Sequence, residues 1–288
     1  MNGGRTCAPP GMKRGSEMGK YSLENHERYR SVKIRPPRLA AYQPVAWDGA
    51  AVVLDDREAL ARARASGMPF ALVIRVGGEP LAETGRRLAQ ASLQTHWRVG
   101  PVFVDWAADH DRFTSPEFVE HVRQEAVRWH AAACCGMSGF GSRVELRKIA
   151  WAREATAGGL LPVRLWWVSS GTSPVYGAHP IRLRISNGQA SHVIPLAEDI
   201  GRFLEGDDTT NRMLRLPAVQ PGRYVVSIAA SGYRLAIGDI GLGPPDGDGF
   251  VPLGHVELDL EPRPWMRDIW KTYYPEGYYP LEDPEVPA

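Results

Sequence analysis

The sequence predicts an α/β region followed by an all-β region, and three observations support that division. Between residues 50 and 136, short apolar runs alternate with segments rich in strong helix formers. After residue 160, short strand-like segments recur with turn residues between them, which is typical of an antiparallel β-sandwich. The stretch Gly159–Tyr176 marks the change, because its alternating apolar residues lead into Trp166 and Trp167, break at Gly171 and resume at Pro174.

The α/β region contains four apolar runs of strand length with helix-forming segments between them. The runs are Ala50–Leu54, Phe70–Val76, Pro101–Trp106 and Ala131–Cys135. The helical segments are Arg57–Ser66, Leu81–Gln94 and the residues from Pro116 to about Trp129. Gly67 is a natural stop for the first helix, Ser115 is placed to cap the third, and continuous apolar runs suit parallel strands covered on both faces. This order predicts a parallel sheet with right-handed crossovers, either half of an eight-stranded barrel or a small open sheet.

The all-β region contains about seven strand candidates, which fit one antiparallel sandwich. They are Leu161–Val168, Ile181–Ile185, His192–Leu196, Asn211–Leu216, Arg223–Ala229, Leu235–Ile237 and Val256–Leu260. Adjacent residues of a strand point to opposite faces, so one of Trp166 and Trp167 is expected in the core and the other outside it.

Composition divides the chain into four segments. Residues 1–38 are expected to be disordered or loosely attached, 39–147 to form the βα units, and 148–262 to form the sandwich. Residues 263–288 are an aromatic and proline-rich tail, for which packing across the domain interface, sugar stacking and partner binding all remain open.

The overall composition is that of an ordinary globular protein and excludes several classes of function. Hydrophobic residues make up 43% of the chain and the formal net charge is +1, so no nucleic-acid partner is indicated. The 3 cysteines form no disulfide framework, and neither a signal peptide nor a membrane span is evident. We expect a cytoplasmic protein, or a secreted one if the true N-terminus is missing.

No cofactor or metal is expected. Gly77–Gly78 lacks the strand, glycine and helix order of a nucleotide site. The Asp109–His110–Asp111 run lacks a third spaced metal ligand. Cys134 and Cys135 lack the histidine and acid context of a nucleophile.

Motifs in the second half of the chain resemble a known family. They are Ala157–Gly159, Trp166–Tyr176, Leu216–Tyr224 and Asp248–Val256. In this pattern they resemble the family catalogued as domain of unknown function 4832, whose members are often labelled β-galactosidase-like. Ser169 or Ser170 stands where the family has asparagine, and Phe250 replaces a closing aromatic pair. The resemblance implies a glycoside-hydrolase-type (β/α)₈ barrel followed by the sandwich.

The same resemblance extends upstream, where it implies a partial (half) TIM-like barrel. Gly100–Trp106 matches a strand that ends in glutamate in the family, with Asp105 in its place, and Trp129–His130 matches a later helix end. Arg75 matches an earlier strand end, although Gly77 stands where aspartate is expected. These matches correspond to strands five to eight, with no counterpart for strands one to four. The first half of the barrel is therefore missing from this sequence, absent from a degenerate protein, or supplied by a second chain in a homodimer.

The resemblance implies a saccharide site at the carboxyl ends of the strands. Glycoside hydrolysis uses two carboxylates, about 5–5.5 Å apart for retention of configuration or about 6.5–9.5 Å for inversion. Asp105 stands where the resemblance places a nucleophile, and the candidates for the acid are Glu79, after the second strand, and Asp55 or Asp56, after the first. The residues expected to bind substrate are Arg75, Trp106, Asp109, His110 and His130.

Each of these residues also has a structural interpretation, such as a turn cap for Asp105. The resemblance therefore leaves two functions open. The first is a glycoside-hydrolase-like protein, either active or catalytically degenerate. The alternative is a non-catalytic carbohydrate-binding or scaffolding protein.

Overall fold

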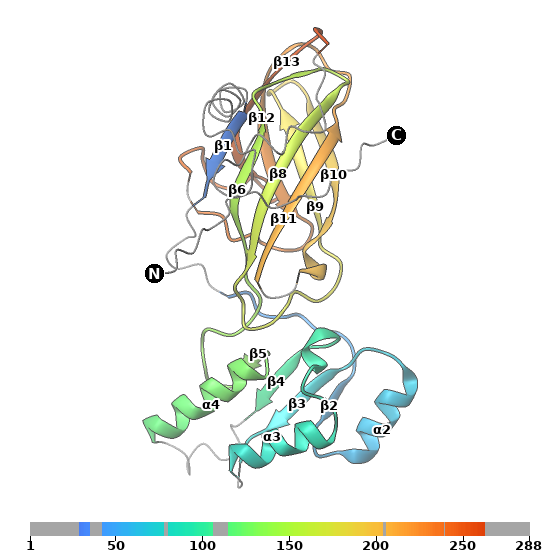
Figure 1. Ribbon diagram of the computed structural model, residues 1–288, viewed down its shortest axis with the longest axis vertical. Coiled ribbons are helices and arrows are strands. Elements are labelled where there is room, and N and C mark those ends of the chain that lie inside the picture. Colours follow the sequence, from blue (N-terminus) through green and yellow to red (C-terminus); the bar gives the residue numbers. More distant parts are fainter. Residues whose placement is uncertain are drawn as a thin grey trace, which may run out of the picture.

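The computed structural model describes residues 29–34, 42–77, 80–105, 115–203, 206–238 and 240–262. These residues form an α/β region and a region of two larger β-sheets, which lie end to end along the long axis of the molecule (Figure 1). Within this described part, no helix is long and apolar enough to cross a membrane.

The α/β region is built on four parallel strands in sequence order. The strands are β2 (Ala51–Val53), β3 (Ala71–Arg75), β4 (Val102–Asp105) and β5 (Ala131–Cys134). The connecting helices are α2 (Arg57–Ser66), α3 (Leu81–Gln90) and α4 (Pro116–Arg128), and a short 3₁₀ helix, η1 (His96–Arg98), precedes β4. The predicted alternation of strands and helices is confirmed.

The helix ends follow from local chemistry. The Asp56 side chain accepts a hydrogen bond from the Ala59 N–H at the start of α2, and Gly67 ends that helix with a φ of 67°. Ser115 caps α4 by accepting from the Phe118 N–H, with Pro116 in the first turn. α3 ends four residues earlier than expected, because the chain turns at Ser92, whose φ is 53°.

The two faces of the parallel sheet differ. Leu72 and Ile74 on β3, with Val102 and Val104 on β4, pack in one hydrophobic cluster with residues of all three helices. The alternate residues Val73 and Phe103 are half-buried and belong to neither hydrophobic cluster of the chain, and Ala51 and Ala133 are exposed. We call this second side, defined by Val53, Val73, Phe103 and Ala133, the open face. The continuous apolar runs suggested strands covered on both faces, but among the described residues helices cover only one face, as in successive units of a βα barrel.

The second region consists of two sheets with one core between them. One sheet has the order β1-β6-β8-β11 and the other β10-β9-β12-β13-β7. The strands of the first are β1 (Tyr29–Lys33), β6 (Val144–Ala152), β8 (Leu160–Ser169) and β11 (Gly206–Arg215). Those of the second are β7 (Glu154–Thr156), β9 (Pro180–Ser186), β10 (Ser191–Asp199), β12 (Gly222–Ala230) and β13 (Val251–Asp259). All neighbours are antiparallel except β7 and β13.

Side-chain burial confirms how the two tryptophans are placed. Trp167 is completely buried in the core between the sheets, whereas Trp166 is 40% exposed. This alternation fixes the register of β8, because a slip by one residue would exchange the two faces.

Three details of the second region differ from the sequence-based expectation. Tyr29–Lys33, within the segment expected to be disordered, forms β1 and pairs with β6. β6 (Val144–Ala152) is a strand that the sequence pattern does not predict. Leu235–Ile237 is not a strand; Ala236 makes a single bridge to Glu145.

The two regions meet at the amino-terminal edge of the parallel sheet. The Tyr176 hydroxyl donates to the Trp97 carbonyl over 2.6 Å, and the Thr172 hydroxyl donates to the Ala131 carbonyl over 2.8 Å. Since Trp97 precedes β4 and Ala131 begins β5, the carboxyl edge lies at the other end of the α/β region (Figure 1).

Candidate functional site

Two charged side chains meet at the carboxyl edge of the parallel sheet. Arg75 ends β3 and Asp105 ends β4, and the two are register partners. Arg75 Nε lies 4.0 Å from Asp105 Oδ2, with 63% and 42% of the respective side chains exposed. The pairing suggested by the sequence is therefore present, and both groups remain accessible to a ligand.

This pair lies on the open face. Phe103 and Asp105 are two residues apart on β4, as Val73 and Arg75 are on β3, so each pair projects from the same side of the sheet. Val73 and Phe103 are also register partners. Val73 and Phe103 thus form an apolar surface, and the Arg75 guanidinium and the Asp105 carboxylate lie at the carboxyl end of that surface. Such a surface can contact the C–H face of a ligand while donating and accepting hydrogen bonds.

Two of the three acid candidates at this edge have structural roles. Asp55, just after β2, forms an ion pair with Arg87 of α3. Asp56 caps α2. Neither carboxylate is therefore poised to protonate a glycosidic oxygen. Glu79, Trp106, Asp109 and His110 lie outside the described residues, and their predicted roles stay predictions.

His130 lies at the opposite edge of the sheet from Asp105, which corrects the expectation that both contact one substrate. It directly precedes β5, and its ring stacks on that of Trp97 with centroids 3.9 Å apart. Its φ of 52° is uncommon for a residue other than glycine. This position makes His130 part of the junction between the regions.

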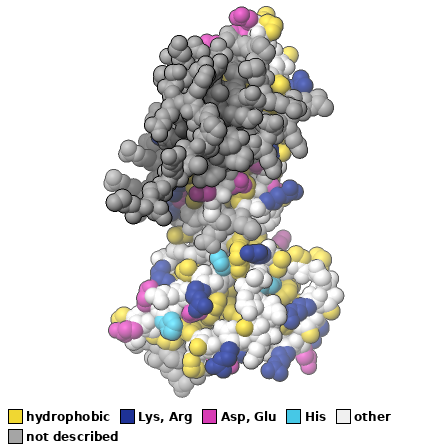
Figure 2. Space-filling model, in the orientation of Figure 1, with side chains coloured by type: hydrophobic (Ala, Val, Ile, Leu, Met, Phe, Trp, Pro, Cys, Tyr) yellow, Lys and Arg dark blue, Asp and Glu magenta, His cyan; other side chains and the backbone are white. Residues whose placement is uncertain are grey.

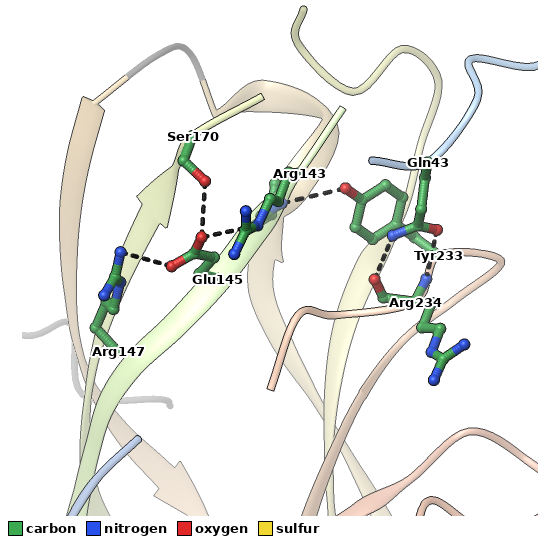
Figure 3. Close-up of polar contacts among 8 residues, drawn as sticks. Gln43, Arg143, Glu145, Arg147, Ser170, Tyr233 and Arg234 are labelled. Carbon is green, nitrogen blue, oxygen red and sulfur yellow. Dashed lines mark hydrogen bonds and ion pairs between the residues drawn. The ribbon is translucent and has the colours of Figure 1, made fainter. Parts of the chain in front are cut away.

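A buried ion cluster near the same junction was missed by the sequence analysis. Glu145 on β6, only 2% exposed, lies 2.8 Å from Arg143 Nε and 2.7 Å from Arg147 Nη2, and accepts from the Ser170 hydroxyl over 2.8 Å (Figure 3). The sequence Arg143–Arg147, in which charged residues alternate with apolar ones, held the signal, since residues two apart share a face of a strand.

The cluster belongs to a polar network that joins a connecting segment to the sheets. Gln43 donates to the Arg234 carbonyl and accepts from the Arg234 N–H, and the Val144 N–H donates to the Tyr233 hydroxyl (Figure 3). Both carboxylate oxygens of Glu145 already have partners, because Oε1 contacts Arg143 and Ser170 and Oε2 contacts Arg147. Glu145 therefore has a structural role.

Two further kinds of reactive site, a cysteine nucleophile and a metal site, can be assessed for the described residues. Burial raises the pKa of the Cys134 thiol to about 11, and its sulfur lies 3.6 Å from that of Met137, so it is no nucleophile. Among the residues that the structure describes, no group of three or more His, Cys, Asp or Glu side chains could hold a metal ion. Basic and acidic side chains are interspersed on the visible face of the α/β region (Figure 2).

Comparisons with known proteins do not assign a family. No family model matches, and no curated protein matches the sequence. Among solved structures, a Listeria innocua β-glucosidase bound to glucose is 13% identical with a TM-score of 0.23, covering 70% of this chain and 32% of its own. An Erythrobacter marinus β-glucosidase is 12% identical with a TM-score of 0.25, covering 71% and 36%.

A third similar structure has a different activity. A Pseudomonas fluorescens alkylpurine DNA glycosylase bound to DNA is 13% identical with a TM-score of 0.25, covering 62% of this chain and 51% of its own. The chain thus spans about a third to a half of these proteins. TM-scores this low carry no argument about fold or activity.

Proposed function

We propose that this protein binds a saccharide on the open face of the parallel sheet, at its carboxyl edge, and does not hydrolyse it. The Arg75–Asp105 pair beside Phe103 is the observation that supports this most directly. A saccharide offers hydroxyl groups that donate to a carboxylate and accept from a guanidinium. It also has apolar C–H faces that pack on an aromatic ring.

The position of the pair fits a partial barrel. Four consecutive parallel strands, with the three described connecting helices on one face, have the arrangement of successive βα units in a TIM-like barrel, where ligands bind at the carboxyl ends of the strands. We therefore interpret the α/β region as half of such a barrel, consistent with the motif resemblance to the domain of unknown function 4832 family. The open face would then correspond to the barrel interior.

The described carboxylates favour binding over hydrolysis. Hydrolysis needs two carboxyl groups with different protonation states on either side of the scissile bond. Asp55 and Asp56 are occupied by Arg87 and by the start of α2. The hydrolytic alternative keeps Asp105 as nucleophile with Glu79 as acid, and is favoured by the match of Gly100–Trp106 to a strand that ends in glutamate.

A glycan array combined with a panel of chromogenic glycosides tests both functions. We expect a defined subset of glycans to bind, with Asp105→Ala binding at least tenfold more weakly and no chromophore released by either protein. Glu58→Ala is the matched control, because Glu58 is an exposed carboxylate paired with Arg62 on α2.

Equal glycan binding by the wild type and Asp105→Ala would exclude this site. Chromophore release that is lost in Asp105→Ala would establish the hydrolytic alternative instead.

A further inference from the structure

The sheet β1-β6-β8-β11 has an outer side that no described sheet or α-helix covers. Its inner side packs on the second sheet, and the described α-helices lie in the α/β region (Figure 1). Trp166 of β8 points away from the core, so its register partners and the residues two positions away share its side of the sheet. We call this side, defined by Lys148, Arg164, Trp166, Asn211 and Arg215, the basic face.

The basic face combines positive charge with a partly exposed aromatic ring. Trp166 is 40% exposed, and Lys33 and Lys148 are aligned with it across β1 and β6. The described acidic side chains on the same side lie near the junction. They are Asp207 and Glu145, and the charge of Glu145 is neutralised by its two arginine partners. The rest of the face therefore favours a partner that is acidic and aromatic.

The middle of the basic face contains an unsatisfied acceptor. Asn211 is 7% exposed, and its Oδ1 atom has no hydrogen-bond partner in the part of the chain that the structure describes. A buried polar atom without a partner is costly, so a donor placed over this face would be stabilising. A tyrosine hydroxyl or a backbone N–H meets that requirement.

The chain itself leads a long segment to the far end of this face. The Thr156 hydroxyl donates to the Glu261 carbonyl over 2.7 Å, which holds the end of the described chain beside the turn before β8. β8 starts at this turn, with Leu160 paired to Arg215, and runs toward the junction (Figure 1). Residues 263–288 continue from Pro262 and are more than twice as long as β8, which has 10 residues. At about 3.3 Å per extended residue, they can span the whole face.

The last part of this segment has the complementary chemistry. Residues 272–288 contain no lysine or arginine, whereas their acidic residues are Glu276, Glu282, Asp283 and Glu285. They also contain four tyrosines, and their recurring prolines favour an extended backbone that can lie flat on a sheet. Residues 1–28 also lie outside the described part, but they carry more basic than acidic side chains. Charge therefore favours the C-terminal segment on this face.

We propose that residues 272–288 dock across the basic face as an extended strap. Their carboxylates lie near Arg164 and Arg215, a tyrosine ring packs on Trp166, and a donor of the strap reaches Asn211 Oδ1. This surface is in the two-sheet region, so the proposal does not depend on saccharide binding at the open face.

Photocrosslinking of the full chain provides the test. The photoreactive residue p-benzoylphenylalanine replaces Tyr278, and mass spectrometry of the irradiated and digested protein locates the new bond. We expect crosslinks within one chain to the peptides of β8 and β11. Arg215→Glu should lower their yield about threefold or more, because an attractive charge becomes repulsive. Arg215 is exposed, so this variant is expected to fold, and Arg223→Glu on the other sheet is the matched control.

A second variant leaves both sheets untouched. It carries Glu276→Gln, Glu282→Gln, Asp283→Asn and Glu285→Gln, and it should lose crosslink yield to a similar degree.

Four results would overturn the proposal. The first is crosslinks that map only outside the basic face, and the second is crosslinks that form only between chains in a mixture of ¹⁴N- and ¹⁵N-labelled protein. The third is an equal yield in the wild type, Arg215→Glu and the variant with four amides. The fourth is a photoreactive residue at Tyr21 that reaches β8 and β11 when the one at Tyr278 does not, which would assign the face to the N-terminal segment.

Discussion

The two regions of this protein use their β-sheets in opposite ways. The antiparallel region closes two sheets on a shared core, which contains most of the largest fully buried side chains, among them Trp151, Trp167 and Tyr224. The α/β region packs helices on one face of its sheet and leaves Val73 and Phe103 half-buried on the other. The first region therefore supplies a closed core, and the second an open surface on which we propose that the ligand binds.

The largest change in the free energy of unfolding is expected when a core side chain of the two-sheet region is truncated. Trp151 is completely buried, and its indole N–H donates to the His255 carbonyl over 3.1 Å. Trp151→Ala should lower the free energy of unfolding by about 3–5 kcal/mol, through the lost burial and the cavity it leaves. Phe103→Ala on the open face should lower the free energy of unfolding clearly less than Trp151→Ala does, because Phe103 is only half-buried. Urea unfolding of both variants measures this, and equal costs would refute the contrast between the regions.

The second-largest loss of stability is expected when the buried ion cluster around Glu145 is broken. Glu145→Ala leaves Arg143 and Arg147 without the carboxylate that neutralises them, which should cost roughly 3 kcal/mol. Glu257→Ala, which removes a mostly exposed partner of Arg223, is the control and should change stability by less than about 1 kcal/mol. A Glu145→Ala protein as stable as the control would show that the cluster is not structural.

Acidification should act on the α/β region through His96. Burial lowers the pKa of His96, whose Nε2 lies 2.8 Å from the Phe70 carbonyl oxygen. Between this lowered folded-state pKa and the ordinary value of about 6.5, the unfolded chain binds more protons than the folded one. The free energy of unfolding should therefore fall as the pH drops below about 6.5, and level off below the folded-state pKa. A His96→Gln variant should lose this part of the pH dependence, and an unchanged pH profile would contradict the assignment.

The smallest effect on stability is expected at the proposed site. The Arg75–Asp105 pair is largely exposed, and exposed ion pairs contribute about 0–1 kcal/mol. Asp105→Ala should therefore unfold within about 0.5 kcal/mol of the wild type while losing ligand affinity. Calorimetric melting of the two proteins checks this, and a large loss of stability would make Asp105 a structural residue.

Local chemistry made the α/β elements and the Arg75–Asp105 pair predictable from sequence. The caps at Asp56, Ser115 and Gly67 act over a few residues, and the paired charges each follow an apolar run that ends at the same edge. The place of His130 was also predictable, because a residue that precedes a parallel strand lies at the amino edge.

Long-range partners explain what the sequence analysis missed. β1 becomes a strand only by pairing with β6, and β6 is interrupted by charges that neutralise each other across the folded sheet. The open face was also hidden, since a continuous apolar run such as Phe70–Val76 is the same whether one face or both are covered.

A double-mutant cycle on saccharide binding tests the central claim most directly. Arg75→Ala, Asp105→Ala and the double variant would be titrated calorimetrically with the glycan that the wild type binds best. If both side chains contact one ligand, each single variant should bind at least tenfold more weakly, and the double variant should lose less than the sum of the two free-energy changes. Wild-type affinity in both single variants would contradict the claim that this edge of the sheet is the binding site.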